Sequence, residues 1–267
     1  SVLLTGTTVA ADRIVLTLDD VPKDGLVVAR VDLAAAAQWC NVQVAADRLR
    51  AFGTPGDKPL PAQFVPDADS PASGTILLRC DPAQSPVRVW LDFSGPPQTN
   101  LPEATTVRTR WYTVTHDPQR MGGLPAEISF TATGRKFDAP RWNDRLYHRQ
   151  LGQFWLREDR KPQVQCVSTG PLGTVVRVSA RYAQPDGKAP ESQPAAVYDW
   201  YYFHDRPLIH ARSVVRQQQP QEWHEAHFLE LGFPTNGFSR LTGGEPRHEG
   251  PFLGKLEANR FNRLGAV

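Results

Sequence analysis

The sequence predicts an all-β protein of two domains, a small β-barrel or β-sandwich followed by an antiparallel β-sandwich. Three observations carry this prediction. Short β-branched and aromatic runs recur along the 267 residues, 24 prolines separate them against a single methionine, and many gaps between runs are short. Prolines occur at strand ends, so they fit many short strands. Loops of hairpin length favour antiparallel strands over helical crossovers.

The first domain is predicted to span residues 1–100. The segment 32–50 is ambiguous, because its alanine run favours a helix while residues 39–44 alternate as a strand does. We interpret it as a strand after a short helical turn. Residues 94–102 are rich in Gly, Pro and polar side chains, which is typical of a linker, so the boundary is placed there. Strands of this domain are expected at residues 13–18, 26–31, 40–44, 75–80 and 87–93.

The second domain is predicted to span residues 101–267. Its runs follow one another closely, which favours an antiparallel meander. Residues 185–194 form a long polar loop of the kind that often borders a binding cleft. Strands are expected at residues 106–115, 127–133, 164–168, 173–182, 196–203, 208–217 and 222–233.

The most informative segment is a hairpin predicted across His204–Pro207. A turn there sorts the two strands into an apolar face and a polar face. The polar face gathers residue types that proton transfer beside an anion requires, with Tyr201 and His210 as candidate catalytic residues. Its pairs are Phe203–Leu208, Tyr201–His210, Asp199–Arg212 and Val197–Val214, and those of the other face are Tyr202–Ile209, Trp200–Ala211 and Tyr198–Ser213.

Arginines on the neighbouring strands extend this polar face. If residues 173–182 pair with residues 196–203, then Arg177 and Arg212 converge with Tyr201 as candidate substrate-binding residues. Forked guanidinium donors suit a carboxylate, which indicates an acidic sugar or another anion. The alternative is a solvated sheet face on which Asp199 and Arg212 form an ordinary cross-strand ion pair.

A second concentration of titratable groups lies at residues 223–231, which read WHEAHFLEL. Only one residue separates Glu225 from His227, so the zincin motif HExxH is absent. In a strand, Glu225 and His227 point to one side, and we take both as candidate catalytic residues. The alternatives are a histidine hydrogen-bonded within a sheet and two turns of helix.

The segment 141–149 mixes aromatic and cationic residues. Trp142 and Arg145 are candidate substrate-binding residues, because aromatic faces stack on sugar rings and arginine pairs with carboxylates. The competing interpretation places Trp142 in the core between strands. Stacking on nucleic acid bases is the rival use of such a segment.

Composition excludes several classes. The net charge of +2 gives no field for nucleic acid or a membrane surface. No run reaches the length of a membrane span, and no serine-hydrolase elbow, phosphate loop or dinucleotide fingerprint occurs. Cys40, Cys80 and Cys166 show no zinc spacing; a Cys40–Cys80 disulfide and three free thiols both stay open.

Two stretches resemble a known family. The run VSTGPLGTVVRV at residues 167–178, followed by LIHAR at 208–212, resembles galactose-mutarotase-like supersandwich domains of carbohydrate-active proteins. The runs LPAQFVPD at 60–67 and GTILL at 74–78 are similar to the small β-barrel domain of bacterial exo-rhamnogalacturonan lyase-like proteins. The resemblance implies a supersandwich, complete or truncated, with the chain continuing beyond Val267.

The resemblance also implies a function. It points to a secreted or periplasmic bacterial polysaccharide lyase that cleaves an acidic polysaccharide by β-elimination at a uronic acid. His210 or Tyr201 would move the proton, and Arg212 or Arg177 would neutralise the carboxylate. The alternatives are a glycoside hydrolase with paired carboxylates among Glu225, Glu230 and Glu245, and a non-catalytic carbohydrate-binding or structural domain. The sequence assigns no metal site, leaves a divalent cation open as cofactor, and names a polysaccharide as partner.

Overall fold

The computed structural model describes residues 2–3, 13–40, 43–53, 58–84, 86–96, 101, 105–138, 141–232, 240–243 and 248–251. These residues form 21 strands, one α-helix and four short 3-10 turns, and every strand pair is antiparallel. The predicted all-β class is confirmed. None of the sheets in the described ranges closes into a barrel, so the N-terminal part is a sandwich.

The N-terminal part packs two sheets around a core of its own. Strict alternation explains the packing, since Ile14, Leu16 and Leu18 all point inward while the residues between them do not. The five-stranded sheet has the order β1 (Val2–Leu3), β2 (Ile14–Leu18), β8 (Val87–Asp92), β4 (Arg50–Gly53), β5 (Lys58–Leu60). The three-stranded sheet has the order β3 (Leu26–Asp32), β7 (Ser73–Arg79), β6 (Ala62–Pro66).

Helix α1 (Leu33–Cys40) takes the place of the expected short helical turn and includes the first residue of the strand expected at 40–44. Residues 43–44 belong to no strand, and residues 41–42 lie outside the described residues. The alanine run prevails because Asp32 accepts a hydrogen bond from the Ala35 backbone N–H at 3.0 Å, and because Leu33 and Ala36 are buried in the core. At eight residues, α1 is short, and over the part of the chain described here no helix has the length and apolar character of a membrane crossing.

The C-terminal part contains three larger sheets and a separate two-stranded ribbon. One sheet has the order β12 (Lys136–Asp138), β11 (Pro125–Phe130), β10 (Tyr112–His116), β9 (Thr106–Arg108). Another has the order β15 (Gln163–Thr169), β16 (Gly173–Arg181), β17 (Ala195–Phe203), β18 (Ile209–Arg216). The third has the order β14 (Gly152–Trp155), β13 (Arg141–His148), β19 (Glu225–Gly232), and the ribbon pairs β20 (Arg240–Gly243) with β21 (His248–Pro251).

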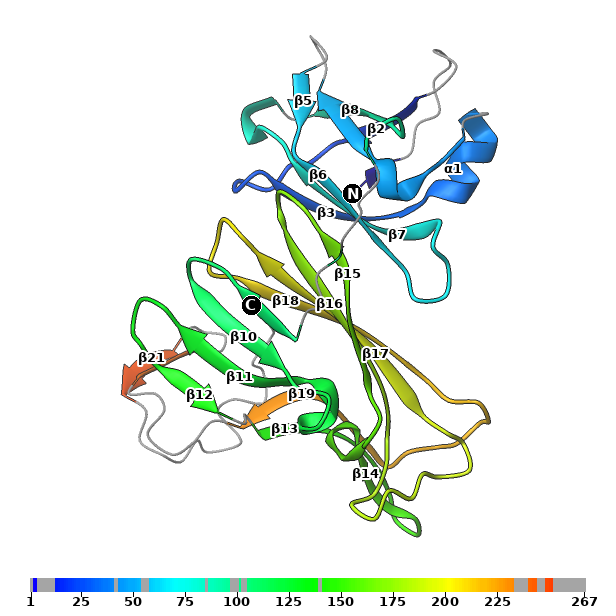
Figure 1. Cartoon of the computed structure of the whole chain (residues 1–267), viewed down its shortest axis with the longest axis vertical. Helices are drawn as coiled ribbons and strands as arrows, with labels where there is room; N and C mark the ends of the chain where they lie inside the picture. The colour runs from blue at the N-terminus through cyan, green and yellow to red at the C-terminus, as the bar shows by residue number, and fades with distance from the viewer. Residues whose placement is uncertain are drawn as a thin grey trace.

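The sheet of β15–β18 is covered on both faces. On one face, Tyr198, Trp200 and Tyr202 pack against strands β10, β11 and β13. On the other face, Tyr201 and Phe203 join a cluster with strands β3, β6 and β7 of the N-terminal part. Figure 1 shows this sheet between the N-terminal strands at the top and β10–β13 below.

The predicted hairpin register is confirmed from Val197–Val214 through Tyr202–Ile209. Strand β18 begins at Ile209, so the predicted Phe203–Leu208 pair lies outside the ladder. Arg177 stands opposite Asp199, as expected if β16 flanks β17.

The predicted set lacks nine of the observed strands, which are β1, β4, β5, β6, β12, β13, β14, β20 and β21. The inward face of β13 explains why that strand escaped prediction, because it reads Trp142, Asp144, Leu146 and a carboxylate interrupts the apolar alternation. The domain boundary placed within residues 94–102 stays a prediction, since most of that segment lies outside the described residues.

Candidate functional site

The polar face of the β17–β18 hairpin forms the contact with the N-terminal part. Tyr201 is 2% exposed, and its side chain hydrogen-bonds Thr75 of β7. Burial raises the pKa of Tyr201. Although the ring centroids of Tyr201 and His210 lie 5.4 Å apart, Tyr201 has no route to a substrate while the two parts are in contact.

Arg177 is fixed in the same contact. Its guanidinium bonds both carboxylate oxygens of Asp199, at 2.6 and 2.9 Å, and donates at 2.5 Å to the backbone oxygen of Pro66. The side chains of Arg177 and Asp199 are only 6% and 7% exposed. The predicted substrate-binding role of Arg177 is therefore corrected to a structural one, because this buried fork has no face left for a ligand. Its ion pair with Asp199 lies within one sheet, and its hydrogen bond to Pro66 reaches the N-terminal sheet.

Arg212 and His210 lie at the border of this contact. Arg212 binds Asp67 of the N-terminal part at 2.9 Å, and Asp67 also binds Arg30. His210 is exposed, and partial desolvation lowers its pKa. The expected pair between Asp199 and Arg212 gives way to two others, since each finds a closer partner.

A cavity of about 280 Å³ opens at this border. Its charges are balanced and largely paired with one another, including Arg216 with Asp69. Its lining residues are Arg30, Asp67, Ala68, Asp69, Ala195, Val197, Asp199, Arg212, Val214 and Arg216. An incoming anion would have to displace a carboxylate already bound there.

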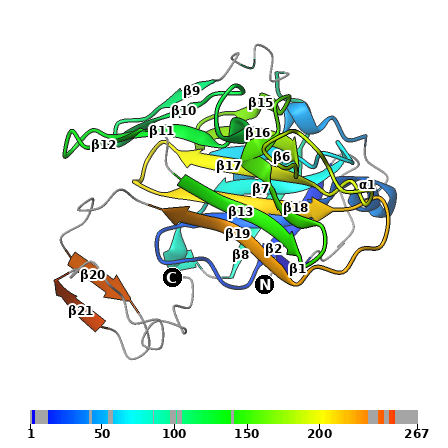
Figure 2. The same ribbon diagram turned by 90° about the horizontal axis from the view of Figure 1, so that it is seen from below.

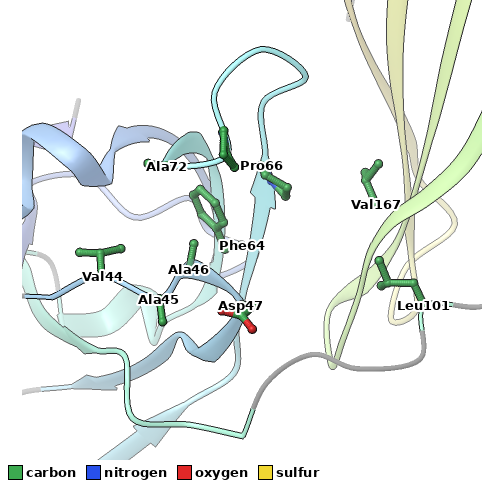
Figure 3. Close-up of a pocket in the computed structure, with 10 residues that line it drawn as sticks. Val44, Ala45, Ala46, Asp47, Phe64, Pro66, Ala72, Leu101 and Val167 are labelled. Carbon is green, nitrogen blue, oxygen red and sulfur yellow. The ribbon is translucent and has the colours of Figure 1, made fainter.

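A larger cavity of about 490 Å³ lies between the two parts on another side (Figure 3). Phe64, Pro66 and Ala72 line it from the N-terminal part, and Val167 and Leu101 face them across the gap. Its lining is mainly apolar. None of the predicted site residues lies in it.

The second predicted cluster is brought together on the β13–β19 sheet. Arg145 of β13 stands opposite His227 of β19 in the register. Glu225 lies two residues before His227 on β19. Arg145 donates to Glu225 at 2.8 Å and approaches His227 Nε2 at 3.2 Å. Figure 2 shows β13 and β19 side by side. Glu225 is 47% and His227 34% exposed, and Arg145 is 20% exposed.

Three neighbours complete this Arg–His–Glu cluster. Glu230 Oε2 lies 3.0 Å from His227 Nδ1, and Asn143 also donates to Glu230. Gln153 of β14 accepts from Arg145 at 2.8 Å. The sequence pattern names Glu230 only as one carboxylate among several and gives no signal for Asn143 or Gln153, because neither carries a distinctive motif.

The contacts of His227 define its tautomer. A carboxylate accepts hydrogen bonds, so Nδ1 carries the proton and donates it to Glu230. Nε2 then accepts from Arg145 and lies 3.5 Å from Glu225. The ring is thus held through Nδ1 by one carboxylate, with Nε2 between Arg145 and Glu225, which is the arrangement of an oriented proton-transfer group.

Trp142 is corrected from a sugar-stacking residue to a core residue. It is 4% exposed, its Nε1 donates to the Pro125 backbone at 2.8 Å, and its ring packs edge-on against Trp200. Both faces of the indole are therefore occupied by protein.

The potential metal ligands and the cysteines are described for most of the chain, but not for all of it. Within the described ranges, no group of three or more His, Cys, Asp or Glu has the geometry to hold a metal ion. Cys80 and Cys166 are free and buried, and burial raises the pKa of both thiols. The side chain of Cys40, and Glu245, lie outside the described residues.

Fold and site together define an antiparallel β-sandwich protein with an exposed Arg–His–Glu cluster on one sheet. In comparisons with known proteins, no family model matches the sequence and no curated protein matches it at a significant level.

Proposed function

We propose that the protein acts on an acidic polysaccharide, cleaving it by β-elimination at a uronic acid, with the Arg–His–Glu cluster as its active site. One observation carries the proposal: Arg145, His227, Glu225 and Glu230 meet on an accessible sheet face, and Glu230 holds Nδ1 of the histidine at 3.0 Å. The Tyr201 and His210 site is set aside, because half of it is buried in the contact between the two parts.

The elimination uses this geometry as follows. His227 Nε2 takes the proton α to the uronate carboxylate, the electron pair forms the new carbon–carbon double bond, and the bond to the leaving glycosidic oxygen breaks. That oxygen receives a proton from the imidazolium, which restores neutral His227. Arg145 binds the substrate carboxylate in place of Glu225 and stabilises the negative charge that develops on it.

The surrounding face supports a sugar chain. Tyr147 stands opposite Glu225 and is half-buried, and its ring offers an apolar surface to the C–H face of a pyranose. Asn143 supplies an amide group beside Glu230, and Gln153 supplies one beside Arg145. An acidic sugar thus meets a cation, an aromatic ring and neutral donors on one surface.

Glycoside hydrolysis is the second candidate. Glu225 and Glu230 both face solvent beside His227, and two carboxylates on one surface are the requirement of that reaction. A third outcome is a carbohydrate-binding module that catalyses nothing.

The test is incubation of the protein with uronate polysaccharides and with a neutral polysaccharide. Elimination gives a product with new ultraviolet absorbance, whereas hydrolysis gives new reducing ends without it. We expect His227→Ala to reduce elimination by about 10²–10⁴-fold, the range of a general base. Arg145→Gln should also reduce it, by removing the cation.

The matched control is His210→Ala, an exposed histidine on the other predicted site. Its rate should stay at the wild-type value. A full rate in His227→Ala, or loss of activity in His210→Ala alone, would overturn the assignment. Binding of a polysaccharide without either product would support the module instead.

A further inference from the structure

The β13–β19 ladder contains an irregularity beside the Arg–His–Glu cluster. Asn143 pairs with Glu230, and the next pair is Arg145 with His227. Two residues of β19, Phe228 and Leu229, therefore stand opposite Asp144 alone. This is a β-bulge, and Leu229 adopts the left-handed conformation with φ of 50°.

The bulge decides which side chains share a face. His227 and Glu230 are three residues apart, so a regular strand would point them to opposite faces. The extra residue restores them to one face, where Nδ1 of His227 reaches Glu230 at 3.0 Å. Leu229 instead packs against the core.

Asp144 lies directly behind this bulge and is 1% exposed. Its Oδ1 accepts from the Tyr182 hydroxyl at 2.6 Å, and its Oδ2 accepts from the Tyr198 hydroxyl. Oδ2 also accepts from the backbone N–H of Leu229 at 3.3 Å. A bulged residue loses its partner in the ladder, so this carboxylate satisfies a donor that the bulge leaves free.

The left-handed conformation of Leu229 carries a cost. A branched, bulky residue rarely adopts positive φ, and such a conformation persists only where its surroundings hold it. The two tyrosines fix Asp144 from β17, which contains Tyr198, and from the residue after β16, which is Tyr182. The bulge is thus tied to the β15–β18 sheet.

We infer that Asp144 is a positioning residue for the Arg–His–Glu cluster: it holds the Leu229 bulge, and the bulge places Glu230 where it orients His227. The inference rests on the proposed function for its meaning, although the geometry is independent of it. Asp144 touches no substrate and acts through Leu229 and Glu230.

The test reads the His227 ring by nitrogen-15 NMR. In the wild type, we expect a dominant Nδ1–H tautomer, and Glu230→Gln should change it because the accepting carboxylate is lost. Asp144→Asn should reproduce that change. Leu229→Ile should do so too while keeping Asp144 and a similar core volume, since a β-branched residue disfavours positive φ still more strongly. This second variant keeps the test open if Asp144→Asn does not fold.

Rescue separates positioning from general destabilisation. Glycine adopts positive φ without penalty, so Leu229→Gly in the Asp144→Asn background should restore the Nδ1–H tautomer. Asp199→Asn is the control, because it damages another buried carboxylate and should leave the His227 tautomer unchanged. An unchanged tautomer in folded Asp144→Asn or in Leu229→Ile would overturn the inference.

The activity assay then gives a separate answer. If the tautomer shifts as expected but His227→Ala keeps full activity, the positioning by Asp144 stands and the proposed function fails. If His227→Ala loses activity but the tautomer is unchanged in the Asp144 and Leu229 variants, the proposed function stands and the positioning by Asp144 fails.

Discussion

At the scale of the residue, His116 shows how burial fixes a protonation state. It is completely buried in the C-terminal core, with Nδ1 donating to the Gly123 backbone at 2.8 Å and Nε2 accepting from the Tyr202 hydroxyl at 2.5 Å. Desolvation lowers its pKa from 6.5 to about 4. The folded protein therefore holds this ring neutral where an unfolded chain would protonate it.

This depressed pKa predicts an acid-sensitive component of stability. Between pH 6.5 and pH 4 the unfolded state binds a proton that the folded state does not, so the free energy of unfolding falls as pH is lowered through that window. The loss due to His116 between pH 7 and pH 5 is roughly 2 kcal/mol. Urea unfolding at both pH values measures it.

His116→Gln is the reference for that measurement, since glutamine does not titrate. The variant should be less stable at pH 7 but lose less stability on acidification than the wild type. If both proteins lose the same free energy of unfolding on acidification, His116 is not the cause of the pH dependence.

At the scale of the element, strand β17 uses each of its faces for a different contact. Trp200 and Tyr202 pack into the core of the C-terminal part, whereas Asp199 and Tyr201 meet the N-terminal part. The Arg177–Asp199 pair is the buried charged group of that second contact, which also contains the partly exposed pair Arg212–Asp67. A buried pair contributes little net stability, but either charge left alone is costly.

The pair predicts a non-additive double-mutant cycle. Arg177→Met leaves Asp199 buried without a cation and should lower the free energy of unfolding by about 3–5 kcal/mol. The double variant Arg177→Met with Asp199→Leu should be clearly more stable than Arg177→Met. Denaturant unfolding of the four proteins measures the coupling, and additive losses would contradict a buried ion pair.

At the scale of the whole molecule, one side chain joins the two parts most extensively. Gln63 of β6 is fully buried, donates to Ser168 Oγ at 2.9 Å and to the Gly173 carbonyl at 3.0 Å, and accepts from the Gly173 N–H at 3.2 Å. The hydroxyl of Ser168 in turn donates to the Phe64 backbone. These hydrogen bonds fix the sheet β3-β7-β6 in position against strands β15 and β16.

Loss of this amide should loosen the two parts from each other. Gln63→Leu leaves the Gly173 N–H buried without its partner, at about 1–3 kcal/mol. The Gly173 carbonyl loses one of its two donors and keeps the Gly170 N–H at 3.1 Å. We expect calorimetry to resolve separate transitions for the two parts, with Gln119→Leu, at an exposed glutamine, behaving as the wild type. A single unshifted transition in Gln63→Leu would show that apolar packing alone holds the contact.

Much of the fold followed from strand periodicity. The two-residue period and a four-residue turn were enough to predict every pair from Val197–Val214 to Tyr202–Ile209. The same reasoning failed at β13, where Asp144 occupies an inward position. At β19 a regular two-residue period puts Glu230 on the face opposite to Glu225 and His227, but a bulge shifts every later residue to the other face and leaves no mark in the sequence.

The sequence by itself determined the all-β class, the faces of the β17–β18 hairpin and the chemical nature of both polar clusters, because these depend on local periodicity and residue type. Only the tertiary structure decided which cluster is accessible. The hairpin face, with Tyr201 and Arg177, lies under the N-terminal sheet, whereas Arg145 and His227 face solvent. Burial depends on contacts between residues more than 100 positions apart, such as Gln63 and Ser168, and no local pattern encodes them.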